Sequence, residues 1–387
     1  MKKKLSLVLA TLMLLGLLAG CGGQPAASGD KDTVVVYIGD IFNSMTPYMT
    51  TANSDQAVFD QVYETLTVTK DDGTVAPCLA KSWKMSDDSL EYTFQLEEGV
   101  KFHNGEVMTA DDVVYSFEQY LANPAKNNFV SMIDKVEMVD ANTVKITLNK
   151  VTPLFLVYIN ELPILNKKFV EEHNGNISDV ACGTGPYKLT SIDLATSAML
   201  ERNDDYRLAP AAIEKVELRY VGDRSTASVQ LETGDLDIMS IDPSQLVSFE
   251  NNDKFTVEKV QTLKTALLAI NTTVAPLDNK LVRQAMTYAV DKQSIITIAY
   301  ENCAVPARLQ ANDTNCFGVD FSDATDFSYN PEKAKELLAE AGYPNGLNFA
   351  DYGIQMDVLG GTYMEKAAQV MQQNFADVGI TIELRNT

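Results

Sequence analysis

The chain has 387 residues, of which 45% are hydrophobic and 22% charged, a composition typical of a globular protein with at least two lobes. Its 53 acidic and 31 basic residues give a formal net charge of -22 at pH 7. Such an acidic surface repels nucleic acid and anionic lipid headgroups, so we exclude nucleic acid as a partner.

The N-terminus has the pattern of a bacterial lipoprotein signal. A basic stretch at 1–4 precedes an apolar run at 5–17, and residues 18–20 complete a lipobox that ends at Cys21. A transmembrane helix is the alternative, but the apolar run is shorter than the roughly 20 residues that cross a bilayer and leaves Cys21 unexplained. We predict a signal peptide over 1–20, lipid on Cys21, and anchoring at the extracytoplasmic face of the membrane.

Residues 21–32 are small and polar and show no hydrophobic periodicity, which is typical of a flexible tether. Two or more lipid chains give stable membrane anchoring. The folded part is therefore expected to swivel above the membrane.

Apolar patterning then predicts the first strands and helices. Residues 33–38 form a short β-rich run, and a helix is expected over 54–64. Residues 90–96 alternate between apolar and polar, and the turn at 97–99 leads into 100–102, which predicts a β-hairpin. Further alternating strands are predicted at 144–148 and 216–220.

Capping residues mark three helices. Thr109 with Asp112 forms a capping box ahead of an apolar stripe. Apolar residues at helical spacing predict a helix over 280–290. Asn330 and the proline after it open a third helix, which Gly342 closes. Strands and helices mix throughout, so the fold class is α/β, with an α+β insertion between about 66 and 182.

The cysteines suggest thiols rather than metal ligands. Cys78 and Cys182 are interpreted as free thiols. Cys303 and Cys316 are close enough in sequence for a disulfide in an oxidising compartment, and two free thiols remain the alternative. No CxxC spacing exists, so we expect neither a metal site nor a cofactor.

No catalytic motif is present. The only histidines, His103 and His173, lie far apart, and His103 follows a strand as a turn residue. Asp235 and Asp237 could pair for acid/base chemistry, but a solvated turn is the simpler interpretation. The sequence lacks a nucleophile elbow, a zinc-protease motif and a phosphate-binding loop, so we predict that the protein is not an enzyme.

Several motifs together resemble the family 5 extracellular solute-binding proteins, the dipeptide, oligopeptide and nickel class of ABC-importer receptors. Each motif is weak alone, but they follow the same order along the chain. The motifs are YETL (63–66), LAKSW (79–83), YTFQL (92–96), GVKFHNG (99–105), TADDV (109–113), GTGPY (183–187), VRQA (282–285) and YNPEKA (329–334) leading to EAGY (340–343).

The resemblance implies a class II periplasmic-binding-protein fold of two lobes, with an extra α+β subdomain in lobe I. Ligand would bind between the lobes and the closed form would dock on a membrane permease driven by ATPase subunits. The predicted parts are lobe I at 33–65 and 183–264, its inserted subdomain at 66–182, and an incomplete lobe II at 265–387.

The resemblance also implies ligand contacts by position. Thr51 and Asn53 correspond to the lobe I wall, Phe129 to an aromatic side chain near the ligand, and Asn271 to the entry into lobe II. The glycines at 183 and 185 permit a close approach of backbone and are interpreted as a structural turn.

Two departures from the family pattern stand out. Met45-Thr46-Pro47 replaces the usual residues of the lobe I loop, so ligand contacts there are expected to differ. Family members run further than Thr387, so we expect the functional receptor to be longer than these residues.

A peptide is the ligand that the resemblance favours, bound by a monomer. Nickel chelates and oligosaccharides remain alternatives, as does a surface lipoprotein that senses a ligand without import.

Overall fold

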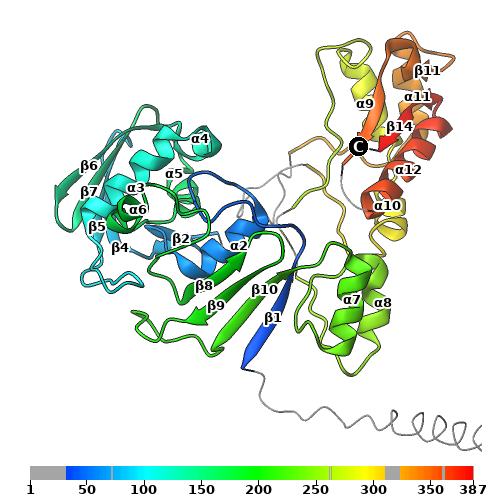
Figure 1. Cartoon of the computed structure of the whole chain (residues 1–387). Helices are drawn as coiled ribbons and strands as arrows, with labels where there is room; N and C mark the ends of the chain where they lie inside the picture. The colour runs from blue at the N-terminus through cyan, green and yellow to red at the C-terminus, as the bar shows by residue number, and fades with distance from the viewer. Residues whose placement is uncertain are drawn as a thin grey trace, which may run out of the picture. The chain divides into compact units, whose positions relative to one another are not determined.

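The computed structural model describes residues 32–70, 73–260, 262, 264–309, 323–359 and 362–386. Its contacts divide the chain into two compact units, the first extending to Met239 and the second from Ser240 onward (Figure 1). The lobe boundary predicted at 265 lies inside the second unit and stays a prediction.

The first unit is built on a four-stranded mixed sheet with helices on both faces. The strands follow the order β1 (Thr33–Ile38), β10 (Lys215–Tyr220), β9 (Ser197–Arg202) and β8 (Tyr187–Asp193). Only β1 and β10 are parallel. Val35 and Tyr37 pack against α7 (Arg224–Thr233), whereas Ile38 belongs to the large core shared with α2 (Asn53–Val62). Successive side chains of β1 point to opposite faces of the sheet, so this strand contributes to two cores.

A second, fully antiparallel sheet forms the predicted insertion. Its strand order is β4 (Ala80–Met85), β5 (Glu91–Leu96), β7 (Thr143–Leu148) and β6 (Ile133–Asp140). Helix α3 (Ala110–Ala122) lies against it (Figure 1). Short elements complete this region: β2 (Thr67–Thr69), β3 (Val75–Pro77), η1 (Pro124–Lys126), α4 (Asn127–Val130), α5 (Phe155–Tyr158), η2 (Ile159–Glu161) and α6 (Lys167–Glu172).

The hairpin predicted from β5 into residues 100–102 is wrong. Strand β5 pairs with β4 before it and with β7 after it. Beyond the turn, Val100 and Phe102 are buried, and the backbone at Phe102 donates to Glu106 O at 2.8 Å. The alternation of β5 records one buried face, which any antiparallel neighbour can satisfy.

The second unit is rich in helices. It holds η3 (Pro243–Gln245), α8 (Leu246–Glu250), α9 (Lys280–Ala289), α10 (Lys292–Ile298), α11 (Pro331–Glu340), η4 (Phe349–Tyr352) and α12 (Thr362–Asp377). Two short parallel pairs join β11 (Leu347–Asn348) to β13 (Ile380–Thr381) and β12 (Gln355–Val358) to β14 (Glu383–Asn386).

The helices predicted in this unit are confirmed. The apolar stripe of α9, including Val282 and Met286, is buried against α11. Asn330 caps α11 by accepting from Lys333 N at 2.9 Å. Among the described residues, no helix has the length and apolarity needed to cross a membrane.

Candidate functional site

The loop that leads into α2 carries two of the predicted ligand contacts. Thr51 and Asn53 are both exposed, Asn53 as the first residue of the helix. Both residues are therefore exposed where this loop of the first unit enters α2. We call residues 41–53 the rim.

One buried carboxylate fastens the rim. Asp55 is 0% exposed and accepts from Asn43 N at 2.7 Å and from Thr50 Oγ1 at 2.6 Å. The Ser54 hydroxyl donates to Ile41 O at 2.7 Å. Two stretches of the rim are therefore held on the first turn of α2. Sequence motifs did not single out Asp55; its position three residues into a helix after a polar loop was the available signal.

Further backbone bonds fix the rim to the rest of the first unit. Phe42 N donates to Leu194 O at 2.9 Å and Met45 N donates to Ser178 O at 2.8 Å. Met45 is fully buried, although it lies where the sequence departs from the family pattern. The departure is thus accommodated in the core.

Phe129 lies on a separate element, α4, and is half-buried. Its ring meets Tyr158 edge-on, with centroids 6.3 Å apart. Lys126, only 1% exposed, places its ammonium 5.7 Å from the centre of the same ring. Burial lowers the pKa of Lys126, and the charge of Glu161 partly opposes that shift.

Asn271 belongs to the second unit and is exposed. Its Oδ1 accepts from Thr273 N at 3.1 Å and from Thr273 Oγ1 at 2.7 Å, which forms a local turn. Of the four predicted contacts, the structure brings Thr51 and Asn53 together on the rim and places Phe129 and Asn271 on other elements.

His103, Gly183 and Gly185 form a tight backbone crossing against the C-terminal end of α2. The His103 ring lies 3.0 Å from Gly185 O through Nε2 and accepts from Gly183 N at 3.3 Å through Nδ1. A Cβ at Gly183 would lie 2.0 Å from Val62 O. Burial lowers the pKa of His103 to about 4, so the imidazole is neutral. These contacts give His103, Gly183 and Gly185 a structural role, in agreement with the turn predicted from the sequence.

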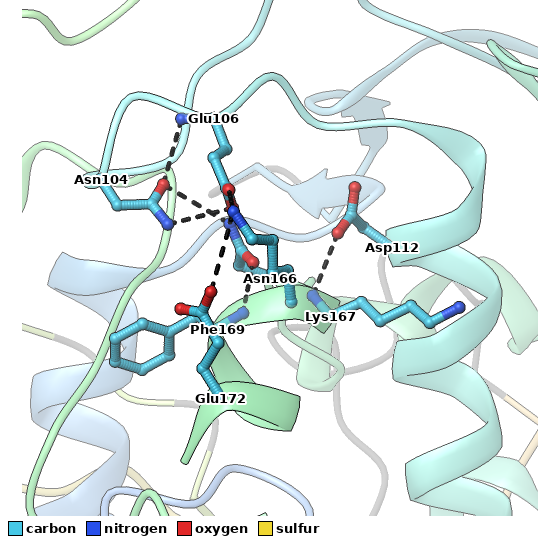
Figure 2. Close-up of polar contacts among 8 residues, drawn as sticks. Asn104, Glu106, Asp112, Asn166, Lys167, Phe169 and Glu172 are labelled. Atoms are coloured by element: carbon cyan, nitrogen blue, oxygen red, sulfur yellow. Dashed lines mark hydrogen bonds and ion pairs between the residues drawn. The ribbon is translucent and has the colours of Figure 1, made fainter. Parts of the chain in front are cut away.

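A polar cluster ties the turn after His103 to α6 (Figure 2). Glu106 accepts from Asn166 Nδ2 at 2.9 Å and from Lys168 Nζ at 2.5 Å. Asn166 also caps α6 by accepting from Phe169 N at 2.8 Å. The charges are therefore paired within the cluster, which fastens two segments of the inserted subdomain to each other.

Asp235 and Asp237 do not form a catalytic pair. Asp237 Oδ2 accepts from Val35 N at 2.9 Å, and Asp235 accepts from Thr233 Oγ1 at 3.0 Å. The two carboxylates, which follow α7, therefore bind different partners and not each other. The structure adds one contact to the solvated turn predicted for these residues: Asp237 accepts a hydrogen bond from the backbone of strand β1.

Cys182 is buried and Cys78 half-buried, and both are free thiols. Burial is the main cause that raises the pKa of each thiol to about 11. Cys303 is exposed, whereas Cys316 and Cys21 lie outside the described residues, so the disulfide and the lipid site stay predictions. In the described part of the chain, no group of histidine, cysteine and acidic side chains could hold a metal ion.

Comparisons with known proteins identify the family. The model of the bacterial extracellular solute-binding proteins, family 5, matches residues 74–387. Heme-binding protein A of Haemophilus influenzae is 30% identical over 98% of this chain and 76% of its own. Glutathione-binding protein GsiB of Pectobacterium atrosepticum is 30% identical over 96% of this chain and 72% of its own.

A solved structure with a similar fold supports the same family. The periplasmic binding protein DppA from Helicobacter pylori, in complex with peptide STSA, superimposes with a TM-score of 0.77 at 27% identity. The match covers 92% of this chain and 73% of that one. The predicted α/β two-lobe fold is confirmed, and since the relatives are transporter binding proteins, so is the prediction that the protein is not an enzyme. The chain belongs to the family 5 bacterial extracellular solute-binding proteins of ABC importers.

Proposed function

We propose that this protein is a lipid-anchored receptor that captures peptides outside the cytoplasm and delivers them to an ABC permease. The observation that carries the choice of peptide is the rim: residues 41–53 contain no charged side chain and expose Thr51 and Asn53 from a fixed backbone. Neutral hydrogen-bonding groups on a hydrogen-bonded loop suit the amide backbone that all peptides share.

The relatives support the same ligand class. DppA of Helicobacter pylori is seen with a peptide, and the GsiB proteins are named for glutathione, whose chemistry is that of a small modified peptide. A receptor of this kind must contact its ligand more extensively when closed than when open, since only such a difference shifts the two populations.

Heme is the second candidate, because heme-binding protein A is 30% identical over nearly the whole chain. His103 cannot serve as an axial ligand without breaking its bonds to Gly183 and Gly185. A heme site in the described residues would therefore need His173 or no histidine at all.

A thermal-shift panel on the full chain tests the proposal. The probes are the peptide Ser-Thr-Ser-Ala, reduced glutathione, hemin, a nickel–histidine complex and maltotriose. A ligand present at 100 times its Kd stabilises the folded state by about 2.7 kcal/mol, which raises Tm by several degrees. We expect the peptide to raise Tm; a shift with hemin, the nickel complex or the sugar and none with peptide would contradict the proposal.

Anchoring and delivery need their own test. Vesicles that contain the cognate permease should accumulate labelled peptide only when the receptor is present. Ligand binding without stimulated uptake would favour the sensing alternative.

A further inference from the structure

Three hydrogen bonds bring two separate stretches of the rim to one point. The Asp55 carboxylate accepts from Asn43 N at 2.7 Å through Oδ1 and from Thr50 Oγ1 at 2.6 Å through Oδ2. Thr50 Oγ1 in turn accepts from Ala52 N at 3.1 Å. The Thr50 hydroxyl thus links the carboxylate to the backbone beside Thr51. We call Asp55 and Thr50 the latch.

The latch is buried, and only part of the rim is exposed: Ile41, Asn43, Met49, Thr51 and Asn53. Asp55 is 0% exposed and Thr50 is 8% exposed. By contrast, Ile41 is 48% exposed and Met49 is 59% exposed. A charged acceptor makes shorter and stronger hydrogen bonds than a neutral one, and here it holds loop backbone that has no regular secondary structure.

Single exposed apolar side chains are ordinary on a protein surface, but those on an immobilised backbone meet a ligand without the entropic cost of ordering a loop. Ile41 and Met49 lie one or two residues from backbone or hydroxyl groups that Asp55 binds. The rim therefore offers apolar contact beside neutral hydrogen-bonding groups, with its shape set before a ligand arrives.

We propose that Asp55, acting through Thr50, is a positioning residue that holds the rim ready for the neutral backbone and an apolar side chain of a bound peptide. This inference rests on the proposed function. Asp55 does not touch the ligand; it removes the entropic cost of ordering the rim on binding.

Thr50 offers a matched pair of variants. Thr50→Val keeps the shape of the side chain but loses the hydroxyl, whereas Thr50→Ser keeps the hydroxyl and loses a methyl group. Calorimetry of the full chain with Ser-Thr-Ser-Ala should show about tenfold weaker binding for Thr50→Val and recovery of most of that loss for Thr50→Ser. Amide exchange at Ala52, whose N–H donates to Thr50 Oγ1, should speed up in Thr50→Val and not in Thr50→Ser.

A third variant separates positioning from a general loss of stability. Ile146→Val removes one buried methylene from β7, which lowers Tm without altering the rim. We expect its peptide affinity to match that of the unmodified chain. If Thr50→Val lowers Tm and leaves affinity unchanged, the latch is only structural and the inference is wrong.

The latch and the peptide assignment can be contradicted separately. Peptide binding by the unmodified chain with no difference between the Thr50 variants contradicts the latch alone. No binding of Ser-Thr-Ser-Ala by the unmodified chain, alongside binding of hemin, contradicts the peptide assignment; the same variants then test the latch with hemin. Absence of binding to peptide, glutathione and hemin would overturn both.

Discussion

His103 shows how burial changes what a single residue can do. A histidine in a turn is commonly solvated, but both ring nitrogens here face the backbone of Gly183 and Gly185. Loss of solvation is the largest cause that lowers the pKa of His103 to about 4. The residue is therefore unsuited to proton transfer near neutral pH and works as a neutral bridge between two segments.

This burial predicts a pH dependence of stability. In the unfolded chain, histidine has a pKa near 6.5, so between pH 6.5 and about 4 the unfolded state binds a proton that the folded state does not. The contribution of the neutral imidazole is complete above pH 6.5 and is lost as the pH falls toward 4, to a total of about 3 kcal/mol at most.

Urea unfolding of the full chain and of His103→Gln across this pH range measures the effect. The free energy of unfolding of the unmodified chain should approach that of the variant as the solution is acidified. A difference between them that stays constant from pH 7 to pH 4 would show that His103 is not held neutral.

Gly183 is limited by space rather than by its backbone angles. A Cβ there would lie 2.0 Å from Val62 O and 2.7 Å from Val62 C, both backbone atoms that cannot rotate away. We expect Gly183→Ala to lower the free energy of unfolding by about 3 kcal/mol. Gly39→Ala is the control, because its Cβ would meet nothing closer than the Tyr37 hydroxyl at 3.9 Å. Equal denaturation midpoints for the two variants would contradict the crossing geometry.

At the scale of elements, Asp112 connects two helices. Its carboxylate accepts from Thr109 N at 2.9 Å, at the start of α3. It also accepts from Lys167 N at 3.0 Å, in the first turn of α6, the contact drawn in Figure 2. The capping box was legible in the sequence because its partners are three residues apart. The second contact was not, because 55 residues separate Asp112 from Lys167.

Replacing Asp112 should therefore cost more than losing one cap. Asp112→Ala leaves two backbone donors without their acceptor, and we expect a loss of about 2 kcal/mol in the free energy of unfolding. The neighbouring Asp111→Ala removes only an exposed ion pair with Lys167 Nζ at 2.8 Å, for which at most about 0.5 kcal/mol is expected. Chemical denaturation of both variants checks the order; a larger effect at Asp111 would refute the interpretation.

The wrong hairpin at β5 has the same cause as the missed contact of Asp112. Period-two patterning gives the existence of a strand and its buried face, and β5 has both. It carries no information on which strand lies alongside, and here the partner β7 follows only after α3, α4 and β6. Local signals thus predicted elements well and strand partners poorly.

For the whole molecule, ordered motifs predicted the family, the fold class and the absence of catalysis, which the comparisons confirm. They did not reveal the latch, because Asp55 acts on backbone atoms of Asn43 and on Thr50, and no spacing rule encodes such loop contacts. The motifs likewise gave no sign that the ammonium of Lys126 lies over the Phe129 ring, a contact that only the structure shows.

The predicted anchor would set where the whole protein lies relative to the membrane and to the proposed permease. A tethered receptor stays near the membrane, so its local concentration there is set by the tether rather than by its affinity for the permease. A single acyl chain binds membranes only marginally, whereas two or more give stable attachment, so the membrane association should depend almost entirely on Cys21.

Cys21→Ser should consequently move the protein from the membrane fraction to the soluble extracytoplasmic fraction, as judged by fractionation and immunoblotting. The matched control is Cys303→Ser, which removes an exposed thiol from the folded part and should leave the protein with the membrane. Mass spectrometry of the tryptic N-terminal peptide would identify the lipid directly. If processed Cys21→Ser protein remained tightly bound to membranes, another segment would have to provide the attachment and the lipoprotein prediction would be wrong.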